Sequence, residues 1–193
     1  MPVQIPDRLT VLTKPDLALG MKTAWGNLWG GPIPIHSLCI VLAQVQLETG
    51  LKSCHNFDLG NAKSIEGDGY DYQFFACGEE LPLGVAQHAA ATSPLVKITR
   101  QYYVGKVAMA SVWVEPEHPW SRFRAFPNLA DGCLDQLKLL HSRFTKAWVA
   151  VESGDPDLFV HYLKLQGYFT APEAQYDHTL VQLYREWLIL LPV

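Results

Sequence analysis

The sequence predicts an α+β fold in which a predominantly helical body carries a small antiparallel β lobe, with a cleft between them. Apolar residues recur at helical spacing before residue 50 and again after residue 128. Between these stretches, aromatic and β-branched runs alternate with Asn, Asp and Gly, as in short strands. The 193 residues, 49% of them apolar, suit one hydrophobic core, so we expect a single domain over 1–193 with its β lobe at about 65–115.

The apolar spacing predicts two helices before the lobe and three after it, near residues 16–29, 34–48, 128–154, 155–167 and 176–190. Gly50 is expected to end the second helix as a left-handed cap. Asp155 and Pro156 have the residue types that favour a helix start, as N-cap and first helical residue. Trp25, Trp148 and Trp187 fall on the inward faces of these helices and are assigned to the core, although the six tryptophans would also suit sugar stacking.

Three runs in the middle of the chain predict two or three strands of a small sheet: "YDYQFF", "LVKITRQYYV" and "VAMASVWV". The last two should form a hairpin that turns near Val104, Gly105 and Lys106.

Composition and motifs argue against several classes of function. A net charge of −4 without a cluster of Lys and Arg gives no attraction for nucleic acid. No run approaches the ~20 apolar residues of a membrane span. The histidines are scattered without ligand spacing, and no nucleotide-binding glycine motif occurs, so we expect neither a metal nor a cofactor. The N-terminus lacks the pattern of a signal peptide, which predicts synthesis in the cytoplasm without one.

The four cysteines lack the paired spacing of a zinc site and are expected to be free, with a Cys54–Cys77 disulfide as the alternative.

Glu48 is the residue that most suggests chemistry. It is the acid at the end of an otherwise uncharged apolar helix, where the negative end of the helix dipole and apolar neighbours both raise a carboxyl pKa. A carboxyl group that stays protonated near neutral pH is what general-acid cleavage of a glycosidic bond requires. The alternative is a solvated residue at a helix end.

Three segments resemble, in the same order, the motifs of one enzyme family: "LAQVQLETGLKSCHNFDLGNAKS", "SRFRAFPNLADGCLDQLKLL" and "DPDLFVHYLKLQGYFTAPEAQY". The first resembles an Ala-Gln helix that ends in Glu-Ser/Thr-Gly and is followed by a Gly-Asn loop and Lys. The second is similar to a Phe-Arg segment, and the third to a Gly-Tyr-x-Thr-x-x-x-Tyr region. Together they resemble the glucosaminidase branch of the lysozyme superfamily, glycoside hydrolase family 73 and its phage relatives, over nearly the whole chain.

The resemblance implies roles for individual residues. Glu48 matches the catalytic acid, and Gly60, Asn61 and Lys63 match a cleft-lining loop that binds the acetamido groups of sugars. Plain turn chemistry is the alternative for the Gly-Asn pair. Tyr168 matches a tyrosine across the cleft from the acid, which can stack on a sugar, or else packs a helix start.

The Phe123–Arg124 pair matches the family's Phe-Arg, with Arg124 as a substrate-side residue or, by its chemistry, a buried partner for a carboxylate.

The second carboxylate departs from the family pattern. Where relatives carry Thr-Glu-Tyr, this chain reads "FFACGEELPLG", and either Glu79 or Glu80 fills the place. An acid pair about 6.5–9.5 Å apart gives inversion through water, and about 5–5.5 Å gives a covalent intermediate. Without a second carboxylate, the N-acetyl group of the substrate or the 6-hydroxyl of muramic acid becomes the nucleophile.

The expected function is therefore that of a bacteriolytic peptidoglycan hydrolase that cuts β-1,4 bonds of the glycan strand, as an N-acetylglucosaminidase. The alternatives are a lytic transglycosylase or muramidase of the same fold, and a non-catalytic wall-binding module of a phage tail or injection device. The expected partner is the peptidoglycan strand, with a phage particle or secretion apparatus as carrier, and the expected place of action is the cell wall or periplasm after release.

Overall fold

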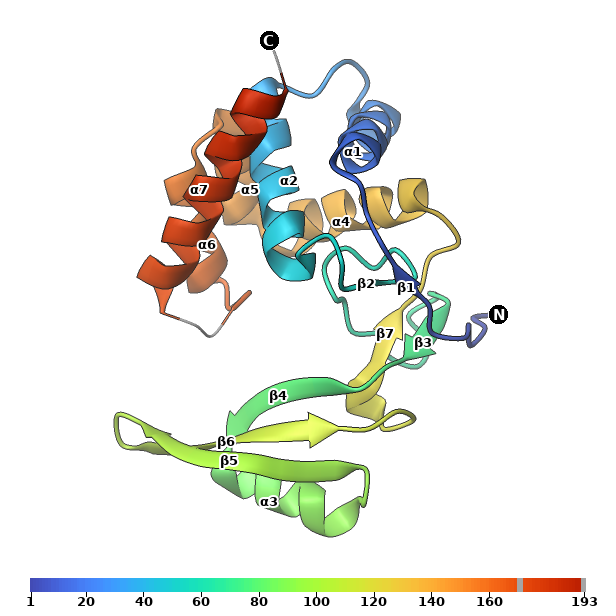
Figure 1. The fold of residues 1–193 in the computed structure, drawn as a ribbon, viewed down its shortest axis with the longest axis vertical. Helices are drawn as coiled ribbons and strands as arrows, with labels where there is room; N and C mark the ends of the chain where they lie inside the picture. Colours follow the sequence, from blue (N-terminus) through green and yellow to red (C-terminus); the bar gives the residue numbers. More distant parts are fainter. Residues whose placement is uncertain (170–171, 192–193) are drawn as a thin grey trace. The chain divides into compact units, whose positions relative to one another are not determined.

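The computed structural model describes residues 1–169 and 172–191 and confirms the α+β class. Over these residues the chain forms seven α-helices and three small antiparallel sheets (Figure 1). It divides into two compact units. The helical unit comprises Leu9–Asn61 and Phe126–Val193, and the β unit comprises Met1–Arg8 and Ala62–Ala125. The predicted β lobe, about 65–115, falls within the β unit.

The described part of the helical unit contains six α-helices and one two-stranded ribbon. The helices are α1 (Lys14–Trp29), α2 (Ile35–Thr49), α4 (Leu129–Arg143), α5 (Thr145–Ser153), α6 (Pro156–Leu165) and α7 (Glu173–Leu190). The ribbon pairs β1 (Leu9–Thr10) with β2 (Cys54–His55). Helix α2 is buried without interruption from Ser37 to Val45 and packs closely with α7, so it forms the centre of this unit's core (Figure 1).

Helix ends follow the predicted signals. Asp155 caps α6 by accepting a hydrogen bond from the Leu158 amide at 2.9 Å, as predicted. Gly50 ends α2 with φ 55° and ψ 13°, the left-handed conformation expected for it. Trp25, Trp148 and Trp187 are all buried, which confirms their assignment to the core.

The prediction of one helix over 128–154 is wrong, because the chain forms two helices there. Phe144 separates α4 from α5, with φ −114° and ψ 53°. Its amide still bonds to the Leu140 carbonyl at 3.1 Å, and its own carbonyl accepts from Trp148 N at 2.8 Å. Its ring is buried. The apolar stripe therefore runs through the break, and apolar spacing alone does not reveal it.

The β unit is built on a three-stranded antiparallel sheet in the order β4, β6, β5. Its strands are β4 (Cys77–Pro82), β5 (Val96–Val104) and β6 (Val107–Val114). The predicted hairpin is confirmed: Val104 pairs with Val107, and Gly105 turns with φ 60°. Two shorter strands, β3 (Tyr72–Phe74) and β7 (Arg122–Arg124), pair beside the 3₁₀ turn η1 (Pro119–Ser121).

The segment before the hairpin forms a helix that the apolar pattern does not predict. Helix α3 (Leu83–Thr92) lies along one face of the sheet (Figure 1) and buries Ala86 and Ala89 against Val112 and Val114. Its consecutive alanines give no helical periodicity, although alanine has the highest helix propensity.

All four cysteines are free thiols, so the Cys54–Cys77 disulfide does not form. Among the described residues, no helix has the length and apolar character to cross a membrane.

Candidate active site

Glu48 lies in the last turn of α2 and is partly buried. Burial raises its pKa above the usual 4.5, although a hydrogen bond from Tyr176 acts in the opposite direction. The position at the carboxyl end of the helix adds to the effect of burial. The carboxyl group therefore keeps its proton to a higher pH than a solvated glutamate would.

Tyr176 fixes one oxygen of this carboxyl group. Its hydroxyl donates to Oε1 of Glu48 at 2.8 Å from the first turns of α7. The ring is buried and stacks on Phe169, with centroids 3.9 Å apart and planes 3° from parallel. Burial and the neighbouring Glu48 charge raise the pKa of Tyr176, so its hydroxyl stays a donor.

Two buried glutamines extend this arrangement. Gln44 lies one turn before Glu48 on α2, and its Nε2 donates to the Tyr168 hydroxyl at 2.5 Å. Gln136 of α4 in turn donates to Oε1 of Gln44 at 2.8 Å. The charge of Glu48 is among the causes that raise the pKa of Tyr168, after burial. We call these five side chains the Glu48 network. They join helices α2, α4 and α7 with the turn after α6.

The loop that contains Gly60 and Asn61 lies against Gln136 of the same network. A Cβ on Gly60 would lie 2.4 Å from Oε1 of Gln136, so any larger residue here would displace the Gln136 side chain. Asn61 follows in the left-handed region with φ 47°, which asparagine tolerates better than most residues. Both residues thus have a role in shaping the turn beside the network.

The loop that carries Gly60 is held tightly against α4. Gly132 of α4 has no room for a side chain, because a Cβ there would lie 2.1 Å from the Phe57 carbonyl oxygen. Phe57 itself has φ 56°, which is uncommon for a bulky residue. Asp58, next to it, is 1% exposed, and its charge is among the causes that raise the pKa of Tyr168.

Three of the predicted site residues therefore come together in the helical unit: Glu48, Tyr168 and Gly60, with Asn61 next in the chain. Sequence reasoning missed Gln44, Gln136 and Tyr176. Gln44 could have been found as a polar residue one turn before Glu48 on an apolar helix, and Tyr176 as the closing Tyr of the third motif. Gln136 gives no such signal.

The other predicted residues belong to the β unit. Lys63 pairs with Glu79 of β4, Nζ to Oε1, at 2.5 Å. Glu80 is the next residue of β4, so it faces the opposite side of the sheet, where it accepts a hydrogen bond from the Tyr102 hydroxyl. The two candidates for the second carboxylate thus have separate surroundings.

Arg124 lies over the ring of Tyr70, 3.9 Å from its centroid. Its positive charge is one of the causes that lower the pKa of Asp68, although hydrogen bonds from backbone amides contribute more.

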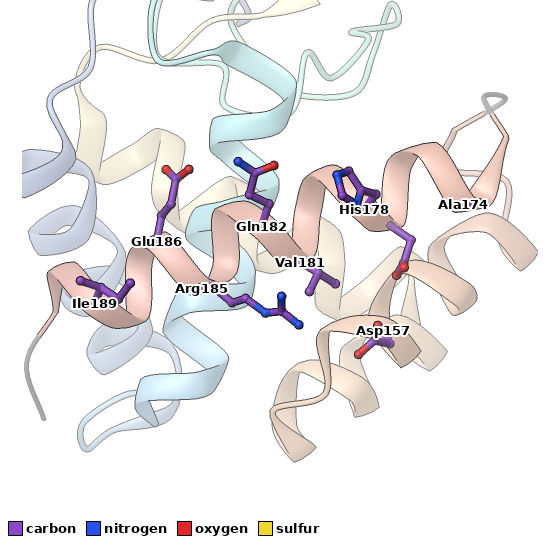
Figure 2. A pocket seen from close by; sticks show the side chains of 9 residues that line it. Asp157, Ala174, His178, Val181, Gln182, Arg185, Glu186 and Ile189 are labelled. Carbon is purple, nitrogen blue, oxygen red and sulfur yellow. The ribbon is translucent and has the colours of Figure 1, made fainter.

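A surface hollow of about 680 Å³ lies along α7 (Figure 2). None of the site residues predicted from the sequence lines it. Asp157 of α6 and Asp177 of α7 are among the residues that line it. Arg185 lies one helical turn beyond Val181 (Figure 2). Its polar groups carry both signs of charge. Over the described residues, no three His, Cys, Asp or Glu side chains gather as ligands for a metal.

No family model, curated protein or solved structure matches the chain. The candidate site therefore depends on the geometry and chemistry of its own residues.

Proposed function

We propose that the chain is a lysozyme-like peptidoglycan hydrolase that cleaves β-1,4 bonds of the glycan strand, as an N-acetylglucosaminidase, with Glu48 as general acid. The observation that carries the proposal is a partly buried carboxyl group at the end of α2 that accepts a hydrogen bond from the Tyr176 hydroxyl. Burial raises the pKa of this carboxyl group. General acids of glycosidases are tuned in this way, by an environment that disfavours the charged form. The motif order in the sequence supports the same function.

The hydrogen bond from Tyr176 determines which oxygen of Glu48 reacts. Since Oε1 accepts the tyrosine proton, the acidic proton of the neutral carboxyl group resides on Oε2. Oε2 then donates this proton to the glycosidic oxygen as the bond from that oxygen to the anomeric carbon breaks. The carboxylate that remains is stabilised by the same tyrosine hydroxyl. A water molecule supplies the oxygen that ends up on the anomeric carbon, and the proton that it loses restores the acid.

Gln44 and Gln136 act as positioning residues for the Tyr168 hydroxyl in this proposal. Gln136 orients Gln44, and Gln44 orients the Tyr168 hydroxyl, through hydrogen bonds between buried groups. A phenol held in this way keeps its own proton for an acceptor on the substrate, such as a sugar or acetamido oxygen. The network thus holds one acid and two tyrosine hydroxyls in fixed relation.

The test is digestion of purified peptidoglycan by the wild-type chain and by Glu48→Gln, with fragments analysed by mass spectrometry. The matched control is Glu117→Gln, which removes an exposed carboxylate after β6. Reducing-end N-acetylglucosamine from wild type and control, but not from Glu48→Gln, is the expected result. Release by Glu48→Gln at the wild-type rate would overturn the assignment of the acid.

Other products identify the other activities. Reducing-end muramic acid would indicate a muramidase, and anhydro-muramyl ends a lytic transglycosylase in which the 6-hydroxyl attacks. Wall binding without release by any of the three chains would replace the enzyme with a binding module.

A further inference from the structure

The β unit contains a hollow of its own, with a volume of about 290 Å³. Its walls are largely apolar, formed by Ile65, Leu81, Pro119 and Trp120. Lys63 and Glu79 are the charged groups that line it. Ligand pockets begin at about 300 Å³, so this volume suits one ring of a larger ligand.

The ammonium group of Lys63 is already engaged on several sides. It donates to the Trp120 carbonyl, pairs with Oε1 of Glu79 at 2.5 Å and approaches Sγ of Cys77 at 3.6 Å. It also lies over the ring of Phe123, 3.8 Å from its centroid. An ammonium group has three hydrogens to donate, so these contacts occupy them. Lys63 therefore holds the residues that line the hollow in place and has no hydrogen left to donate to an anion.

Glu79 supplies the polar function that a ligand would meet. Its Oε1 takes the ion pair with Lys63, and Oε2 has no hydrogen bond to any residue of the described ranges. A carboxylate paired with an ammonium group leaves the site without net charge, so it favours a neutral ligand over an ion. The free oxygen accepts an O–H or N–H from that ligand.

Trp120 supplies the apolar surface and is itself held in place. It belongs to the short turn η1, where its amide donates to Nδ1 of His118 at 3.1 Å. The edge of its ring meets the His118 ring, with centroids 5.0 Å apart. A partly exposed indole beside one acceptor matches a ligand ring that has an apolar C–H face and a rim of donors. A sugar ring has both.

We propose that this hollow binds one sugar ring of the glycan, with the C–H face of the ring against Trp120 and a hydroxyl or acetamido N–H donated to Glu79. The identity of the glycan rests on the proposed function. The hollow gives Glu79 a role in binding, whereas Glu80 faces the other side of β4.

The test is calorimetric titration of the full chain carrying Glu48→Gln with the β-1,4-linked tetramer of N-acetylglucosamine, which this variant should not cleave. Trp120→Ala should weaken binding about tenfold or more, since truncation of a buried aromatic anchor has effects of this size. Ile65→Glu, at a 70% exposed position on the rim, should weaken it as well without loss of folding. The matched control is Trp113→Ala, which removes a 42% exposed tryptophan on the opposite face of the sheet.

Unchanged affinity in both Trp120→Ala and Ile65→Glu, or no binding of the tetramer, would overturn the proposal for the hollow. Digestion of the wall by the wild-type chain is measured in parallel. Digestion of the wall without sugar binding in the hollow would overturn only the proposal for the hollow. Binding that depends on Trp120, together with no digestion, would support sugar binding in the hollow and reject the proposed hydrolase activity.

Discussion

Replacing Glu48 by glutamine should make the protein more stable at neutral pH, even though it removes the proposed catalytic acid. Glutamine has nearly the same shape, can still accept the hydrogen bond from Tyr176 and is never charged. The wild-type carboxyl group, in contrast, must either ionise in a partly buried place or hold a proton that water would remove.

The pH dependence follows from the direction of the pKa shift. The folded-state pKa of Glu48 lies above the usual 4.5, which the unfolded chain keeps. The stability contributed by the bound proton is fully present below about pH 4.5 and is lost as the pH rises through the folded-state pKa. Stabilising single substitutions commonly contribute about 0.5–2 kcal/mol. We expect a gain of about 1–2 kcal/mol for the glutamine variant at neutral pH, because glutamine removes the charge and keeps the hydrogen bond from Tyr176.

Thermal unfolding followed by circular dichroism between pH 4 and pH 8 measures this difference. A chain of this size shifts by roughly 2–4 °C per kcal/mol, so Tm should rise by about 2–8 °C at neutral pH. The two curves should converge toward pH 4, whereas Glu117→Gln should follow wild type throughout. If Glu48→Gln lost stability by the same amount at every pH, the carboxyl group would have no raised pKa and the argument would be refuted.

Three further predictions concern other residues. Tyr176→Phe removes the hydrogen bond that lowers the pKa of Glu48. The alkaline limb of the pH profile of kcat on peptidoglycan should therefore move to higher pH. A uniform drop in kcat at every pH would mean that the tyrosine only supports the fold. Gly132→Ala places a Cβ 2.1 Å from a backbone carbonyl oxygen and should lower the free energy of unfolding, measured in urea, by about 2 kcal/mol or more. The control Gly84→Ala, at an open position in α3, should be neutral or slightly stabilising. Equal effects of the two substitutions would show that the close approach at Gly132 does not limit stability. Alkylation of the native protein at pH 8, mapped by mass spectrometry, should label Cys77 before the three fully buried thiols, and early labelling of those three would show that the core opens.

Helix positions were predictable where capping residues and apolar spacing agree. Gly50 and Asp155 set ends that the structure reproduces, because left-handed caps and side-chain N-caps are local properties of the chain. The division at Phe144 was not predictable in the same way, since a buried aromatic residue continues the stripe while its backbone leaves the helix. Helix α3 was missed because its alanines carry no polar and apolar alternation.

The candidate site was predictable only in part, for a related reason. Glu48 is conspicuous as an acid at the end of an apolar helix, and Tyr168 follows a glycine after α6. Gln136 is surrounded by leucines in the sequence, and only the packing of α4 against α2 gives its amide a partner in Gln44. Long-range polar pairs of this kind leave no periodic trace, so spacing cannot predict them.

The loop that follows α2, from Gly50 to Asn61, has a consequence for mutational tolerance. Four of its non-glycine residues, Leu51, Asn56, Phe57 and Asn61, have positive φ. Gly132 of α4 admits no Cβ where the loop packs against it. The path of the loop is thus set by backbone conformation and close approach rather than by side-chain identity. In a scan of all single substitutions, glycine should be accepted at the four positive-φ positions more readily than other residues. The least replaceable position around this loop should be Gly132, which has no side chain with which to touch a substrate.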